Sequence, residues 1–194
     1  MEGFRMDRVQ LKNMAKAQIK SNIWMLLLIS IIIGAITGLL NIVLPPLGSV
    51  ASLLAASAFS LATVKIYLRL SDGIKPEVED TFATIKEFWP AFKVTFFTGL
   101  FTFLWSLLLF IPGIIKMYSY SMAMYILAEN PNIGALDALK QSENMMKGHK
   151  MEMFILDLSF IGWYLLVSVT GGIASIWVTP YITATKTNFY NSIK

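Results

Sequence analysis

The sequence predicts an all-α polytopic membrane protein with six transmembrane helices in three helical hairpins, each preceded by a short cytoplasmic amphipathic helix. Hydrophobic residues make up 56% of the 194 residues and charged residues only 14%, a balance outside that of soluble domains. Apolar stretches recur near the roughly 20 residues that a helix needs to cross the hydrocarbon. Charged segments and uncharged turns also alternate. We therefore expect residues 1–194 to form one integral membrane domain, with hairpins at about 22–70, 91–128 and 151–190.

The first hairpin follows a basic segment. Residues 1–21 are compatible with a helix on the cytoplasmic leaflet, because basic side chains surround a loose apolar face. The apolar side chains of that face are Val9, Met14 and Ile19. Residues 22–44 then form the first span, and residues 48 to about 70 return as the second.

Small side chains recur along both helices of this hairpin. Small ridges allow helices to approach closely in lipid, so the two helices should pack against each other or against a third helix through these residues. They are Gly48, Ser52, Ala56 and Ser60 on the second helix, and Ser30, Gly34 and Gly38 on the first.

The second hairpin follows an acidic connection, residues 71–90, which ends in a short interfacial helix. Residues 91–111 form the third span. Residues 114–128 form a short and unusually polar fourth helix, much of whose surface should face protein or water. The third unit opens with a short amphipathic helix at about residues 132–147, which Gly148 ends.

The fifth span is predicted at residues 151–169 and the sixth at 173 to about 190. Proline and glycine mark the turns and an interruption of the sixth span. These positions are Pro45, Pro46, Pro112, Gly113, Gly171, Gly172 and Pro180. The turns inside the hairpins carry no charged residue, so the positive-inside rule places both termini in the cytoplasm of a protein of the cell membrane.

The second half of the chain carries residues typical of a known family. They include Ile111-Pro112-Gly113-Ile114-Ile115-Lys116, Ile126-Leu127-Ala128-Glu129-Asn130-Pro131 and Leu156-Asp157-Leu158-Ser159-Phe160-Ile161-Gly162-Trp163. With these residues the chain resembles the domain of unknown function family 975, most closely from about Leu109 to Tyr190. The resemblance implies a polytopic protein of the cytoplasmic membrane, of a kind found mainly in Gram-positive bacteria. It implies no activity and no catalytic residues.

Asp157 is a charged residue inside a predicted span. It lies about six residues into the fifth span, roughly 9 Å below the cytoplasmic boundary, and a charge at this depth needs a partner or water. Lys65 reaches a similar level from the second span, so we expect Asp157 to pair with Lys65, with Arg69 and Lys186 as the next partners to consider. Such an acid either ties helices together or acts as a proton or ion site.

Further polar side chains belong to the fourth and sixth helices. Lys116 is expected to extend to the outer headgroups or to line a cavity. The hydroxyl groups either line a common cavity or bond locally around a proline kink. They belong to Tyr118, Ser121 and Tyr125 on the fourth helix and to Thr179, Tyr181, Thr183 and Thr185 on the sixth.

The sequence leaves three functional hypotheses of unequal weight. The leading one is a nonenzymatic protein that binds another membrane protein, lipid or a membrane-active peptide, as an immunity or envelope-homeostasis factor would. The alternative is a small-solute transporter or channel-like conduit. An enzyme acting on lipid would depend on His149 with Glu152, which solvated surface charge explains better. No catalytic group, cofactor or metal is expected from the motifs, and basic residues that flank spans do not indicate nucleic-acid binding.

Overall fold

The computed structural model describes residues 7–43 and 48–194, and within these ranges every regular element is helical. The all-α fold class is therefore confirmed. The elements are α1 (Arg8–Lys20), α2 (Ile23–Val43), α3 (Gly48–Ser71), α4 (Val78–Ala83), the 3-10 helix η1 (Thr84–Glu87), α5 (Phe88–Leu108), α6 (Phe110–Ser119), α7 (Ala123–Glu129), α8 (Ala135–Met145), α9 (Lys150–Leu158), α10 (Ile161–Val169) and α11 (Ser175–Ile193).

Four stretches of the described chain are long and apolar enough to cross a membrane. They are Ile23–Ile42, Ala51–Ser71, Val78–Leu107 and Lys150–Val169. The predicted fourth helix is divided into α6 and α7 by a turn at residues 120–122, and the predicted fifth is divided into α9 and α10 at residues 159–160. Local breaks of this kind leave backbone groups that other parts of the protein must satisfy.

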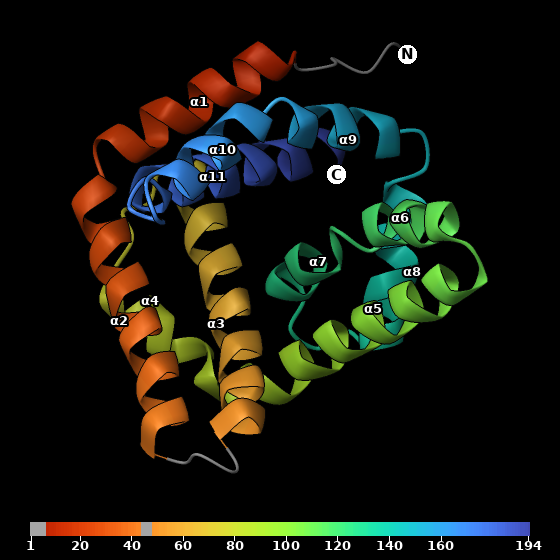
Figure 1. Cartoon of the computed structure of the whole chain (residues 1–194), viewed down its shortest axis with the longest axis horizontal. Helices are drawn as coiled ribbons and strands as arrows, with labels where there is room; N and C mark the ends of the chain where they lie inside the picture. Colours follow the sequence, from red (N-terminus) through yellow and green to blue (C-terminus); the bar gives the residue numbers. More distant parts are fainter. Residues whose placement is uncertain (1–6, 44–47) are drawn as a thin grey trace.

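α3 lies at the centre of the packing. It contacts α2, α4, η1, α5, α7 and α11, and its Leu61, Ala62 and Ile66 side chains are almost fully buried. In Figure 1, α2 and α3 stand side by side, α1 and α11 lie across one end of this pair, and α5 to α8 form another side. The helices therefore surround α3 at several crossing angles and do not form a simple bundle.

The predicted packing of the first hairpin is confirmed for the two helices, which contact each other, and for Ser52, but not for the glycines. α2 and α3 do lie together, and the Asn41 amide donates a hydrogen bond of 2.7 Å to the Ser52 hydroxyl, which lies 3.4 Å from the Thr37 carbonyl oxygen. A Cβ added at Gly34 or Gly38 would meet nothing within 4 Å. The predicted close approach through these two glycines is therefore wrong, and polar contacts nearer the turn join the helices there.

The predicted turn residues have different outcomes. Pro45 and Pro46 lie outside the described residues. Gly171 and Gly172 have φ values of 58° and 93°, which favour glycine and confirm this turn. Pro180 lies inside the continuous helix α11, so the predicted interruption there is wrong. A proline inside a helix removes one backbone hydrogen bond, and Pro180 is buried among its neighbours in the fold.

Gly113 allows α6 to fold back tightly onto α5. A Cβ added at this glycine would lie 2.9 Å from the Ser106 Cα and would overlap the Ser106 hydroxyl. Such distances are closer than van der Waals contact allows. The predicted turn at residues 112–113 is thus a close contact between two helices, and the chain reverses at Leu109, between α5 and α6.

The turn of the second hairpin lies beside the start of the third unit. Ile111, beside this turn, lines the same pocket as Lys150 at the start of α9, and the Tyr118 and Phe154 rings are in edge contact with centroids 6.0 Å apart. The sequence placed residues 111–113 on the outer side and Lys150 on the cytoplasmic side. Neighbouring residues cannot lie on opposite sides of roughly 30 Å of hydrocarbon, so these two expectations are incompatible.

Candidate functional site

Asp157 of α9 lies in a polar cluster that joins three helices. Its carboxylate forms an ion pair of 2.9 Å with the Lys186 ammonium of α11 and accepts a hydrogen bond of 3.3 Å from the Tyr118 hydroxyl of α6. The Lys186 and Asp157 side chains are 29% and 23% exposed. The pair compensates for the partial burial of both charges, which would be costly for either charge alone.

The predicted pairing of Asp157 with Lys65 is wrong. Lys65 pairs with Glu87, with N–O distances of 2.8 and 2.6 Å, and Arg69 pairs with Asp80. Both acids come from the elements between α3 and α5, which pack against α3. The position of a residue along a span gives its depth in the membrane but not the side of the helix on which its side chain lies. Of the three cations considered from sequence, Lys186 is the one that faces α9.

Lys116 of α6 also has a partner that the sequence did not indicate. Its ammonium lies 2.6 Å from the Glu143 carboxylate of α8 and 5.1 Å from the centre of the Trp105 ring. Lys116 was expected either at the outer headgroups or lining a cavity near that surface, and Glu143 was expected in a cytoplasmic helix. An ion pair of this length joins residues at the same level, so placing them at opposite surfaces is wrong.

Ser142 forms hydrogen bonds with backbone groups at the break between α6 and α7. It is fully buried, donates a hydrogen bond of 2.8 Å to the Ser119 carbonyl and accepts one of 3.1 Å from the Met122 N–H. Buried backbone groups at a helix break are costly without such partners. Sequence reasoning missed this role. The available signal was a serine on the buried face that α8 forms with Ala138 and Leu139.

The Ser121 and Thr183 hydroxyl groups are bound locally, and Tyr125 and Tyr181 pack through their rings. Ser121 donates to the Tyr118 carbonyl and Thr183 to the Thr179 carbonyl, at 2.8 and 2.9 Å. Tyr125 of α7 is stacked on the Tyr190 ring of α11 at 5.0 Å between centroids. Tyr181 packs edge-on against the Phe160 and Trp163 rings. These contacts match the local-bonding alternative for the two serine and threonine hydroxyls.

α1 packs along α11, and its buried face differs from the predicted one. Leu11, Ala15 and Ile19 are buried, whereas Val9 and Met14 are 60% and 39% exposed. Only Ile19 was predicted on the right side. The four-residue spacing of the buried side chains is typical of a helix that packs on another helix, which is the signal that could have found them.

Two amides fix α1 to α11. Gln18 donates to the Asn188 side-chain oxygen at 3.2 Å, and Asn188 donates to the Gln18 side-chain oxygen at 3.1 Å. Asn188 also lies 3.3 Å from the Leu11 carbonyl oxygen, to which it donates. The Asn188 side chain is buried, so this exchange of hydrogen bonds sets the position of α1 on the protein.

Lys12 of α1 lies at the break between α9 and α10. Its ammonium donates to the Ser159 carbonyl at 3.4 Å and stands 4.4 Å above the centre of the Phe160 ring. Burial, together with the positive charges of Arg8 and Lys16, lowers the pKa of Lys12. The cation thus satisfies a carbonyl that the helix break leaves available.

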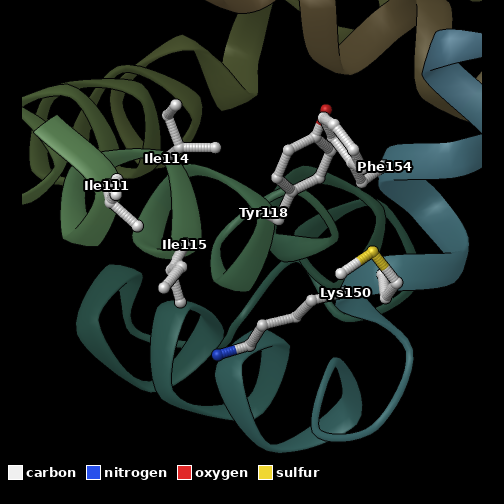
Figure 2. Close-up of a pocket in the computed structure, with 7 residues that line it drawn as sticks. Ile111, Ile114, Ile115, Tyr118, Lys150 and Phe154 are labelled. Carbon is white, nitrogen blue, oxygen red and sulfur yellow. The ribbon is translucent and has the colours of Figure 1, made fainter.

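A pocket of about 250 Å³ lies between α6 and α9. Figure 2 shows Ile111, Ile114 and Ile115 of α6 on one side of it and Phe154 of α9 on the other, with the Lys150 side chain extending across toward Ile115. Tyr118 and Met151 complete the lining. The pocket is apolar, with one cationic side chain at its edge, and it was not predicted from the sequence.

His149 and Glu152 form a pair at the start of α9. The His149 Nδ1 lies 3.0 Å from the Glu152 carboxylate, as an i,i+3 pair on one helix end. Among residues 7–43 and 48–194, no group of three His, Cys, Asp or Glu side chains could hold a metal ion.

A known family matches most of the chain. The family described as "Protein of unknown function (DUF975)" matches residues 6–119 and 107–194. The chain belongs to this family. The DUF975 match includes the N-terminal half, which carried little of the resemblance in the sequence motifs. No curated protein and no solved structure matches the chain.

Proposed function

We propose that this DUF975 protein is a nonenzymatic integral membrane protein that acts by binding a membrane component: another membrane protein, a lipid or a membrane-active peptide. The observation that supports this proposal most is that its polar side chains bond to other parts of the protein. Asp157, Lys186 and Lys116 are engaged in ion pairs between helices, and the Ser121 and Thr183 hydroxyls bond to their own chain segments. Large apolar side chains, in contrast, are exposed along α5 and α10.

The proposed topology has both termini in the cytoplasm and hairpins at about residues 22–70, 91–128 and 151–190. A reporter active only in the cytoplasm should give signal when fused after Gly73, Pro131 or Lys194. It should give none after Pro46 or Gly172, because the turns inside the hairpins carry no charge. Signal after either of these two positions would refute the topology.

The second hairpin needs its own fusion, because the contacts between Lys116 and Glu143 and between α6 and α9 place it beside residues expected in the cytoplasm. A reporter after Gly113 decides this point. Absence of signal would mean that α5 crosses the membrane and, because Ile111 and Lys150 line one pocket, that Lys150 lies on the outer side as well. Signal would mean that α5 and α6 form a hairpin on the cytoplasmic side, and the number of spans would fall from six to four.

The binding proposal is tested by purification from mild detergent, followed by identification of the proteins and lipids that copurify. A stoichiometric membrane component is the expected result. If the purified protein alone moved a solute across liposome membranes, the binding proposal would be wrong.

The conduit is the second candidate, because the paired Asp157 and Lys186 side chains keep 23% and 29% of their surface exposed. The chain has no cysteine, so single cysteines at Ser121 and Thr183 can be tested with a water-soluble thiol reagent. A cysteine at exposed Lys140 is the positive control, and one at buried Ala138 is the negative control. Labelling of both test positions at the rate of the Lys140 control would favour the conduit, and protection of both would favour the binding protein.

A further inference from the structure

We propose that the pocket between α6 and α9 binds one acyl chain of an anionic phospholipid, whose phosphate is held by the Lys150 ammonium. This inference rests on the proposed function and names the class of ligand. The pocket of about 250 Å³ is bounded by isoleucines of α6 and by Met151 and Phe154 of α9. An apolar cavity does not hold water well and accepts apolar ligands instead.

The apolar walls open toward the surroundings of the protein. Ile111 and Met151 are 69% and 64% exposed, and Ile115 and Phe154 are also exposed. In a protein embedded in a bilayer, the abundant apolar material at such an opening is the lipid acyl chain. A chain lying between the two helices would cover these side chains on both walls.

The charge at the edge of the pocket selects the headgroup. Within residues 7–43 and 48–194, the Lys150 ammonium has no hydrogen bond or ion pair, while the nearby Lys116 is neutralised by Glu143. Lys150 is half-buried at the start of α9, and its side chain extends toward Ile115 with the ammonium at its end (Figure 2). A phosphate at this place would gain the attraction that basic residues exert on anionic lipid.

The Tyr118 hydroxyl contributes to the shape of the site rather than to headgroup binding. It lines the pocket but donates its hydrogen bond to Asp157. Tyr118 therefore offers its ring to the pocket lining, and Lys150 is the lining residue that carries a charge. This polarity matches a phospholipid, which is apolar along its chain and anionic at one end.

The test uses the full chain in vesicles that contain phosphatidylglycerol with a photoreactive diazirine in its acyl chain, followed by mapping of the labelled residues. Labelling should concentrate on the pocket walls, at Met151, Phe154 and Ile115. Unlabelled phosphatidylglycerol should compete better than phosphatidylcholine. Inorganic phosphate should not compete, because it lacks the acyl chain.

Two variants separate the headgroup from the chain. Lys150→Gln should reduce the preference for phosphatidylglycerol about fivefold, and Ile114→Trp should fill the pocket and remove labelling there. The matched controls are Lys140→Gln on the exposed side of α8 and Leu165→Trp on α10, which is 63% exposed. Neither control should change the labelling of the pocket.

Labelling spread evenly over the exposed apolar faces of α5 and α10 would overturn the proposal, as would equal competition by the two lipids or an unchanged Lys150→Gln variant. These results would leave the proposed function standing if a stoichiometric partner still copurified with the Ile114→Trp variant. The proposed function itself fails only when solute transport by the purified protein is measured.

Discussion

The ion pair between Asp157 and Lys186 should dominate the coupling between α9 and α11. Asp157→Asn or Lys186→Met leaves the other charge in a site where the side chains are only 23% and 29% exposed. At 2.9 Å and an effective dielectric constant of about 20, the attraction amounts to about 6 kcal/mol before desolvation is subtracted. Because both side chains keep some access to the surroundings, we expect each single variant to lose about 2 to 3 kcal/mol of unfolding free energy.

A double-mutant cycle in detergent measures this coupling. The variant with both Asp157→Asn and Lys186→Met should lose only about 1 kcal/mol, since it leaves no lone charge. Against single losses of about 2 to 3 kcal/mol each, the coupling energy should be about 3 to 5 kcal/mol. The matched control is a second cycle with Asp157→Asn and Lys65→Met. The losses of unfolding free energy in this cycle should be additive, because Lys65 pairs with Glu87. The reasoning is refuted if the cycle with Lys186 is additive within about 0.5 kcal/mol, or if the cycle with Lys65 shows the larger coupling.

Three further changes test the packing. Gly113→Ala should lower the unfolding free energy by about 1 to 3 kcal/mol, because the added Cβ would overlap Ser106. The control is Gly99→Ala, whose Cβ would meet nothing within 4 Å, so this variant should be neutral or stabilising. Equal effects of the two variants would contradict the close contact at Gly113. Ser142→Ala should cost about 1 to 3 kcal/mol by leaving two buried backbone groups unpaired, and a neutral result in chemical unfolding would show that the α6–α7 break does not depend on it. Asn188→Ala should speed amide hydrogen exchange in α1 far more than in α3, whereas unchanged exchange in α1 would show that the amide pair does not hold this helix.

The candidate site could be predicted only in part from the sequence. The depth of Asp157 correctly indicated that it needs a partner, and Lys186 was among the three cations within reach. The choice between Lys65 and Lys186 depends on which way each side chain points around its helix and on which helices are neighbours. The sequence gives no direct measure of either. The roles of Ser142 and of the pocket were missed for the same reason, since both arise between helices that lie apart in the chain.

The sequence by itself determined the all-α class, the apolar stretches, the glycine turn at residues 171–172 and membership of the DUF975 family. These follow from local properties: apolar length, turn chemistry and backbone freedom at glycine. The tertiary structure alone decided that α6 lies beside α9 and that α1 packs on α11 through Leu11, Ala15 and Ile19. Helix-to-helix contacts are set by the fit of whole surfaces, and a linear pattern of residue types does not specify which surfaces meet.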